Sequence, residues 1–491
     1  MRTIAESIVE LTTTKDKLVH NLEVDGQVPE GKTFSQMVDM PFDAEYDVDD
    51  GVYTIEDFPI DLSTWTADGE ISFIYSNNYE GAINHQVGTT SGNFRMIVHD
   101  GVNEIYNASF TRDAVAGYNM TKGNGEVIWA VKFSPVVAGQ KLTYCRVIKP
   151  ASVTMAYYNI GMRLAYVNTD SLTTMYSMFN HAGSSKSPLL EKVYIKSTKN
   201  VTSMTYMCYD CRALKVISCP DWDTSKVVTF TYCFYQCNML KWIPMTTTTN
   251  IATDVQGMFN ACYMLRKIPA LVFREDVAVN FGTMFSGCFS LEVFPARMNT
   301  SKSTSMDSVF ANCYNLKVVP EGVSTDNATT MYNLFNSCYN LTEIPNFNTS
   351  NVTTMAYTFN GCRNLKKLPA LSDISKVTRM EGFATDDCAI NDGFTLDLST
   401  APTTLQIFVT TTVNALRGLI VNPLTTWSAS GTVIDIYSSG LDRTALIALF
   451  NSLGTVVGKT IRITNSLGAS SLTAADLLIA TNKGWTVNKT T

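Results

Sequence analysis

Apolar residues return at a fixed spacing along the middle of the chain. In six consecutive units of 24–26 residues, a phenylalanine is followed by a cysteine after three residues, a leucine after six and a proline after ten. One unit alone cannot bury its apolar residues, but stacked units align them in a shared core. The pattern therefore predicts a repeat solenoid with a period of about 25 residues. The phenylalanines are Phe234, Phe259, Phe285, Phe310, Phe335 and Phe359.

Spacing within a unit predicts its local structure. An apolar residue four before the phenylalanine, such as Met331 before Phe335, and the cysteine three after it share one face of a helix. We therefore expect a short helix or helical turns with this face inward. The leucine and proline predict an extended segment of about three to five residues, ending near the proline because proline has no N–H for a sheet. Serine or threonine in segments such as 349–353 is expected to cap the helical piece.

Three strings carry a family resemblance: D-W-D-T-S-K-V (221–227), M-Y-N-L-F-N-S-C-Y-N-L (331–341) and F-N-T-S-N-V-T-T-M-A-Y-T-F-N-G-C-R-N-L (347–365). They closely resemble the BspA-like leucine-rich repeats of bacterial surface proteins and gut phages, over about residues 166–390. The resemblance implies the fold. It leaves the function open, because the family is functionally diverse.

The flanks of the repeats have other patterns. Alternating or apolar runs at 71–75, 94–98 and 127–131, separated by glycine and asparagine, predict an antiparallel sandwich or jelly-roll-like domain. The last hundred residues keep strand-like runs with helical segments between them, and we expect degenerate repeats that close the solenoid. The expected order is a helical anchor and oligomerisation segment (1–43), a β-rich domain (44–150), repeats (151–390) and a C-terminal cap (391–491).

The first residues follow heptad spacing, with apolar side chains at Ile4, Ile8, Leu11, Leu18 and Leu22. This predicts a short coiled coil for oligomerisation; the alternative is an amphipathic helix packed on its own domain. The following segment, which includes T-F-S-Q-M, resembles the leading segment of tailed-phage structural proteins, including fibres. With the repeats, it implies a fibre or decoration protein of a gut, crAss-like phage. Such a protein is made in the host cytoplasm, binds other virion proteins and, by analogy with fibres, forms a trimer.

Composition narrows the function classes. Apolar residues make up 45% of the 491 residues and charged residues 16%, which indicates a folded chain. The formal net charge of -7 argues against a nucleic-acid partner. No stretch approaches the roughly 18 apolar residues of a membrane span, and the N-terminus lacks the apolar core of a signal peptide. We therefore expect no nucleic acid, membrane span or export signal.

The twelve cysteines follow the repeat more than any metal motif. Stacked coils separate equivalent side chains by roughly 4.7–4.9 Å, whereas disulfides need Cβ atoms about 3.5–4.5 Å apart, so we expect a ladder of buried thiols. Zinc needs four converging ligands, and only Cys208 and Cys211 have a C-x-x-C spacing. We expect no cofactor; the states of Cys145, Cys219 and Cys233 stay open. The ladder comprises Cys211, Cys237, Cys262, Cys288, Cys313, Cys338 and Cys362, and Cys388 continues its spacing.

The acidic segment at 47–51 leaves a second metal question open. It resembles the start of a calcium-binding loop, but Phe58 stands where such a loop has its twelfth-position glutamate. The alternative is a solvated acidic linker.

Surface side chains of the solenoid give two candidate binding stripes. The residues directly after the repeat cysteines predict an aromatic row that could meet sugar rings or a protein partner; the alternative is that the rings seal the edge of the core. Lys215, Lys241, Arg266, Lys317 and Lys366 follow the repeat leucines, and we interpret them as a solvated face. The candidate binding residues are Tyr263, Phe289, Tyr314, Tyr339 and Trp242.

The sequence thus favours adhesion over catalysis. Its four histidines are scattered without a catalytic pattern, so we expect no enzyme and no catalytic or metal-binding residues. The leading hypothesis is a virion protein that presents the solenoid to a host surface protein or glycan. One alternative is a bacterial surface adhesin, which needs an export signal. Another is a glycan-degrading tail protein, which needs paired carboxylates at roughly 5–9.5 Å.

Overall fold

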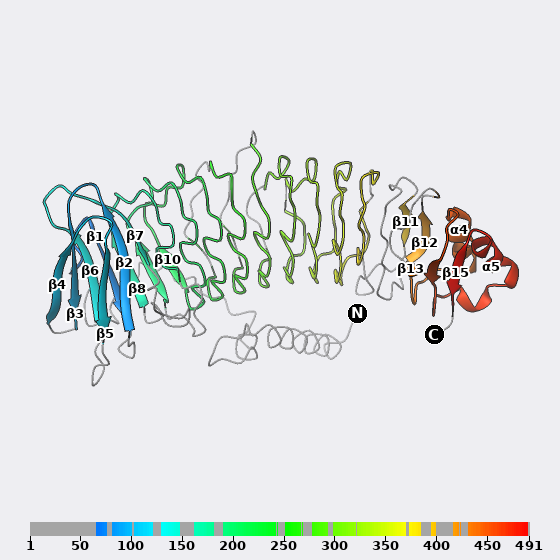
Figure 1. The fold of residues 1–491 in the computed structure, drawn as a ribbon, viewed down its shortest axis with the longest axis horizontal. Coiled ribbons are helices and arrows are strands. Elements are labelled where there is room, and N and C mark those ends of the chain that lie inside the picture. The colour runs from blue at the N-terminus through cyan, green and yellow to red at the C-terminus, as the bar shows by residue number, and fades with distance from the viewer. Residues whose placement is uncertain are drawn as a thin grey trace.

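In the computed structural model, the described residues form one elongated body, with sheets at one end, a row of stacked coils, and helices at the other end (Figure 1). One apolar core runs through it from Ile71 to Trp485. The predicted repeat solenoid is thereby confirmed. No helix of the described chain is long and apolar enough to cross a membrane. The structure describes residues 65–75, 81–100, 103–120, 129–147, 162–180, 190–241, 243, 251–266, 268, 277–292, 298–320, 322–369, 373–383, 394–398, 416–421, 423 and 431–489.

The N-terminal part consists of two sheets with their apolar faces together. One sheet contains the antiparallel strands β1, β6, β3 and β4, and the other has the order β5-β2-β7. His85 of β2 stacks on Phe73 of β1 at 4.9 Å between ring centroids and lies 5.1 Å from Phe133 of β6. The strands are β1 (Glu70–Tyr75), β2 (Gly81–Thr89), β3 (Phe94–His99), β4 (Glu104–Phe110), β5 (Val115–Met120), β6 (Trp129–Pro135) and β7 (Leu142–Val147).

The first coils of the solenoid extend one of these sheets. Strand β8 (Met162–Asn168) pairs antiparallel with β1 and parallel with β9 (Lys192–Ile195), which pairs parallel with β10 (Val216–Ser218). One seven-stranded sheet therefore joins the two parts, in the order β10-β9-β8-β1-β6-β3-β4.

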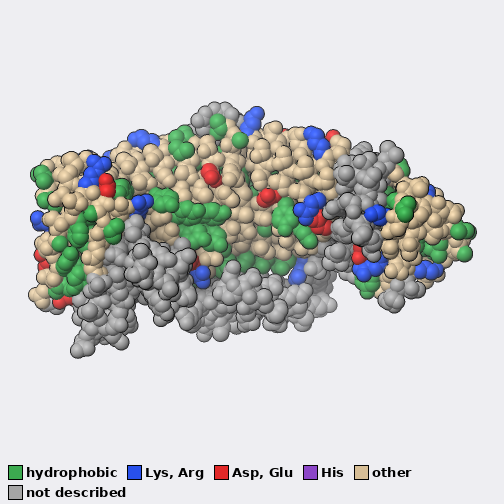
Figure 2. Space-filling view, in the orientation of Figure 1, with side chains coloured by type: hydrophobic (Ala, Val, Ile, Leu, Met, Phe, Trp, Pro, Cys, Tyr) green, Lys and Arg blue, Asp and Glu red, His purple; other side chains and the backbone are tan. Residues whose placement is uncertain are grey.

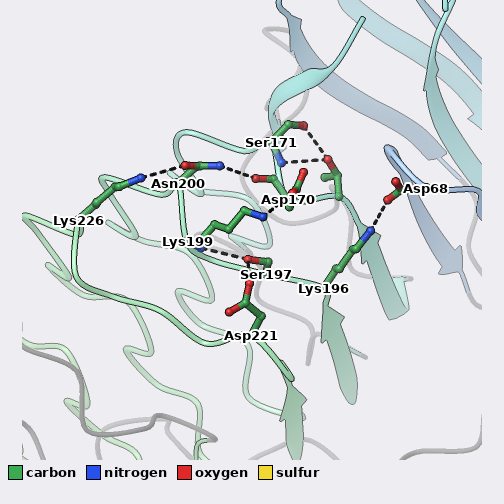
Figure 3. A network of polar contacts seen from close by, with 10 residues as sticks. Asp68, Asp170, Ser171, Lys196, Ser197, Lys199, Asn200, Asp221 and Lys226 are labelled. Carbon is green, nitrogen blue, oxygen red and sulfur yellow. Dashed lines mark hydrogen bonds and ion pairs between the residues drawn. The ribbon is translucent and has the colours of Figure 1, made fainter. Parts of the chain in front are cut away.

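Polar side chains reinforce this junction (Figure 3). Lys196 pairs with Asp68, next to β1, and Lys199 Nζ lies 2.6 Å from an oxygen of Asp170. Lys226 of the next coil donates to Asn200 Oδ1 at 3.0 Å. Lys199 lowers the pKa of the Asp170 carboxyl, chiefly by hydrogen bonding to it. These contacts link successive coils through their exposed loops, so we interpret the network as structural.

The inward stripe of each unit is buried. Of the two forms expected for it, a short helix or helical turns, the backbone forms no helix but a run of turns. In the coil of Phe234, the N–H of Tyr232 donates to Gln256 in the next coil at 2.8 Å, whereas the N–H of Cys237 donates to Phe234 of its own coil at 3.1 Å. Successive N–H groups of the run alternate in this way. A helix would direct all of them within one coil.

The turns also need left-handed backbone that an α-helix does not contain. Tyr232 and Gln236 have φ of 51° and 55°, and equivalent residues of the other coils share this conformation. Such backbone costs L-residues about 1–2 kcal/mol each. We use the term turn coils for those that contain the seven ladder cysteines.

The structure differs from two further expectations about the repeat unit. The threonine of the T-S segments does not cap a helix: Thr300, 1% exposed, donates to the carbonyl of Ser324 in the next coil at 2.7 Å and accepts the N–H of that residue at 2.8 Å. The extended segment is shorter than expected in the described later coils, where a single bridge joins Val318 and Glu343. Pro320 follows two residues later and has no N–H to continue a ladder.

The last coils are helical. Strand β11 (Phe394–Leu398) pairs parallel with β12 (Leu416–Val421). Strand β14 (Lys459–Arg462) pairs parallel with β13 (Gly431–Asp435) on one side and with β15 (Trp485–Asn488) on the other. The coils of residues 431–489, called the helical coils below, contain three helices that stand beside these strands (Figure 1). They are α4 (Arg443–Ser452), η1 (Ala469–Ser471) and α5 (Ala474–Thr481).

Charged side chains close the helix ends in this region. Asp442 accepts the N–H of Ala445 at the start of α4, and Thr473 and Asp476 form a capping box on α5. Arg443 donates to both carboxylate oxygens of Asp476 at 3.0 Å. Lys483 Nζ donates to the carbonyls of Phe450, Asn451 and Leu453 at 2.7–3.0 Å, which satisfies the C-terminal end of α4.

Candidate functional site

Four of the predicted binding residues form a continuous ring stack. Tyr263, Phe289, Tyr314 and Tyr339 lie one per coil, with successive centroids 4.5–4.6 Å apart and ring planes within 7°. The Arg363 guanidinium covers the end of the row, 4.3 Å from the Tyr339 ring. Tyr263 is only 4% exposed and the others are half-buried. Because each ring covers the face of the next, the row presents ring edges and hydroxyls to solvent.

An amide ladder runs beside this row. Asn340 donates to Asn315 at 3.1 Å and Asn364 donates to Asn340 at 3.0 Å, both between side chains of neighbouring coils. Burial raises the pKa of the Tyr314 hydroxyl well above its usual range. The hydrogen-bonded amides and the stacked rings therefore fix the register of neighbouring coils.

The ladder cysteines point into the core, where each thiol has the same partner. Sγ donates to the carbonyl of the residue at the phenylalanine position of the preceding coil, at 3.0–3.2 Å. In the described chain Cys145, Cys219 and Cys233 are also buried free thiols. Burial raises the pKa of Cys288 and Cys338 well above its usual range, which disfavours the reactive thiolate. No group of three or more metal-binding side chains occurs among the described residues.

A second aromatic surface, which the sequence analysis missed, lies on the coils nearest the sheets. Tyr206 and Tyr209 of one coil adjoin Tyr232 and Tyr235 of the next, and we call these four residues the tyrosine patch. All four are half-buried, and Tyr176, 42% exposed, meets Tyr206 edge-on at 6.1 Å. The signal was present in the sequence, since both tyrosines recur after 26 residues, the spacing of the repeat itself.

The rings of the tyrosine patch face two directions. Tyr209 and Tyr235 stack at 4.6 Å from consecutive coils, so their planes lie across the solenoid axis. Tyr206 and Tyr232 are parallel to each other within 9°, at 5.8 Å, but stand at 70° and 87° to their neighbours Tyr209 and Tyr235. The faces of Tyr206 and Tyr232 are therefore turned sideways from the axis, unlike those of the ring stack.

Paired polar groups border the tyrosine patch. Asp210, 4% exposed, accepts from Arg212 Nε at 2.6 Å, and Arg212 Nη2 donates to Gln236 at 3.2 Å. Burial raises the pKa of the Asp210 carboxyl, and the arginine opposes that shift. Burial also raises the pKa of Tyr209 to about 12, so its hydroxyl keeps its proton at neutral pH.

One face of the molecule carries few charged side chains. Figure 2 shows hydrophobic side chains gathered over the coils next to the sheets, in a face that carries few and scattered charges.

Two comparisons with known proteins found a match. The chain is similar to a leucine-rich repeat protein. That protein, from Eubacterium ventriosum ATCC 27560, has 16% sequence identity and a TM-score of 0.27, with 48% of this chain and 62% of that chain covered. The match thus spans less than two thirds of the length of the Eubacterium ventriosum protein. Residues 154–271 and 279–396, a little under half of this chain, match the family described as "Mycoplasma protein of unknown function, DUF285". No curated protein matches.

Several predicted residues lie outside the described part of the chain. They are the candidate ligand residue Trp242, the last cysteine Cys388, the acidic segment 47–51, and the heptad positions Ile4, Ile8, Leu11, Leu18 and Leu22.

Proposed function

We propose that this leucine-rich repeat-like protein is a non-enzymatic adhesion protein, which presents its solenoid to a host surface as a fibre or decoration of a tailed-phage virion. The observation that carries the proposal is the elongated body with one continuous core. Aromatic side chains align over four successive coils in the ring stack and over two in the tyrosine patch, which suits extended contact with a surface. The phage assignment rests on the resemblance of the N-terminal segment.

The adhesion part is tested with the labelled full chain on intact host cells. We expect saturable binding and no release of sugar from surface polysaccharide during incubation. Failure to bind any cell type on which the phage grows would contradict adhesion. Shortened polysaccharide would instead establish a glycan-degrading tail protein.

The virion part needs a separate experiment. Mass spectrometry of purified particles, with immunogold labelling against residues 166–390, should find the protein at the capsid or the tail. Its presence in host envelopes and absence from particles would replace this assignment with the bacterial surface adhesin.

A further inference from the structure

We propose that the tyrosine patch is a binding site for a neutral glycan, with the faces of Tyr206 and Tyr232 as the stacking surface. The inference rests on the proposed adhesive function and adds the ligand class and the residues that recognise it. The aromatic row of the later coils is a different surface, since its rings cover one another.

The backbone beneath the tyrosine patch is shaped for a ring. Gly257, at φ +58°, occupies the position equivalent to Tyr232 in the next coil. A Cβ there would lie 2.3 Å from Cε1 of Tyr232, so the tyrosine ring rests directly on the glycine backbone. The Cδ1–Cε1 edge of Tyr232 packs on that coil, which holds the ring with its faces turned sideways from the axis, and the parallel Tyr206 continues the surface toward the sheets.

A second tyrosine has the same local packing without the platform. Tyr357 lies over Gly382, where a Cβ would be 2.4 Å from Cδ1 of the ring. Its aromatic neighbour Tyr332 meets it edge-on, at 6.1 Å and 89°. Tyr357 thus serves as a matched control, with the same backbone position and no parallel partner.

The chemistry of the patch fits a sugar with no charge. The C–H face of a pyranose packs on the electron-rich face of an aromatic ring. Hydroxyls of the sugar rim can bond to Arg212 and Gln236 at the border, and to the threonine hydroxyls beside them. Thr205, Thr229 and Thr231 form such a chain, at 2.7 and 3.1 Å. Because Asp210 neutralises Arg212, the site offers no net charge to an acidic polysaccharide.

A protein partner fits the same surface less well. Stable protein interfaces bury about 800 Å² on each side around an apolar centre. Within residues 190–241, Val228 is the one large aliphatic side chain more than a third exposed. The polar contacts at the border join Asp210, Arg212 and Gln236.

The test uses the full chain on immobilised neutral polysaccharides (glucans, mannans and galactans), with sulfated and uronic-acid polysaccharides beside them. The wild type should bind at least one neutral glycan. Tyr232→Asn should weaken that binding about tenfold, and the double variant with Tyr206→Asn about a hundredfold. Asparagine tolerates left-handed backbone, so the coil should keep its fold and its thermal midpoint.

Two further variants separate ring stacking from a structural effect. Tyr357→Asn should leave glycan binding unchanged, although it removes a tyrosine with the same packing. Gly257→Ala should weaken binding as Tyr232→Asn does, because the new Cβ displaces the ring. Equal losses in Tyr357→Asn and Tyr232→Asn would overturn the proposal, as would binding to acidic polysaccharides alone or to none.

Cell binding distinguishes this proposal from the proposed function. If wild-type protein adheres to cells and the double variant adheres equally, the glycan site is wrong and adhesion stands. If adhesion is lost after protease treatment of the cells but kept after periodate oxidation, the ligand is a protein. If the wild type binds neutral glycans through the patch but adheres to no host cell, the site stands and the adhesive role is wrong.

Discussion

The turn coils and the helical coils contribute to the same continuous core but satisfy their backbone in different ways. In the turn coils every second N–H of the buried run donates to the next coil, as Phe285 does to Val309 at 3.0 Å. In the helical coils α4 and α5 bond within themselves, and mainly the strands β13, β14 and β15 pair between coils.

This difference explains why helical coils suit the end of the array. A terminal turn coil would leave a row of N–H or C=O groups with no neighbour, and buried groups of this kind cost about 1–3 kcal/mol each. A helix needs partners only at its two ends. Asp442, Asp476 and Lys483 supply such partners here.

The largest effect should follow from cutting the phenylalanine stack. Phe285 is fully buried between Phe259 and Phe310, with centroids at 5.7 and 5.9 Å. Phe285→Ala should lower the free energy of unfolding by about 3–5 kcal/mol in urea titrations. Hydrogen exchange should rise in the coils on both sides, because backbone hydrogen bonds join each of them to the coil of Phe285.

Leu449→Ala, in α4, gives the matched cavity in a helical coil. Leu449 is also fully buried, but its faster exchange should stay within the helical coils and the strand β12, whose Val421 N–H donates to Ser452 of α4 at 3.2 Å. Equal spread of the two disturbances along the solenoid would contradict the comparison.

A smaller and local loss is expected at the end of α4. Lys483→Met removes three hydrogen bonds from a charged donor to the carbonyls of Phe450, Asn451 and Leu453. We expect the local stability of α4 to fall by about 1.5–3 kcal/mol in hydrogen exchange, with the turn coils unchanged. Lys317→Met, at an exposed position of a turn coil, controls for the lost charge. Faster hydrogen exchange in the turn coils of Lys483→Met would contradict the view that the helical coils satisfy their backbone independently of the turn coils.

The cysteine ladder offers a third contrast, since each of its thiols donates to a carbonyl of the preceding coil. Cys288→Val keeps an apolar side chain but removes the bond to the Phe259 carbonyl, which should cost about 1 kcal/mol of unfolding free energy. Cys145→Val in the sheets is the control, because no hydrogen bond of that buried thiol is seen within the described residues. Native protein should resist iodoacetamide at the ladder cysteines until urea is added. Rapid alkylation of Cys288 in the folded chain would contradict a buried, protonated ladder.

The sequence predicted the stacking of units and their inward stripe, because both follow from apolar spacing alone. It did not distinguish a helix from a run of turns. The spacing of Met306, Phe310 and Cys313 fits both, and the destination of each N–H depends on the neighbouring coil. Pairing of β8 with β1 joins segments about 90 residues apart and has no local signal. The tyrosine patch had a weaker signal, because its pair of tyrosines recurs in two coils and ends at Gly257 and Asn260 of the third.

The smallest predicted effect separates the two kinds of coil by its sign. Ser308, in a turn coil, has φ of 54°, and its N–H donates to Tyr332 of the next coil at 2.9 Å. Ser308→Gly removes the penalty of left-handed backbone and should raise the unfolding free energy by about 0.5 kcal/mol, after the entropy cost of glycine. Ala448→Gly, on the exposed side of α4, should instead lower it by about 1 kcal/mol. Urea titration of both variants decides the point: if glycine destabilises both sites equally, the turn coils do not store the strain that their backbone angles indicate.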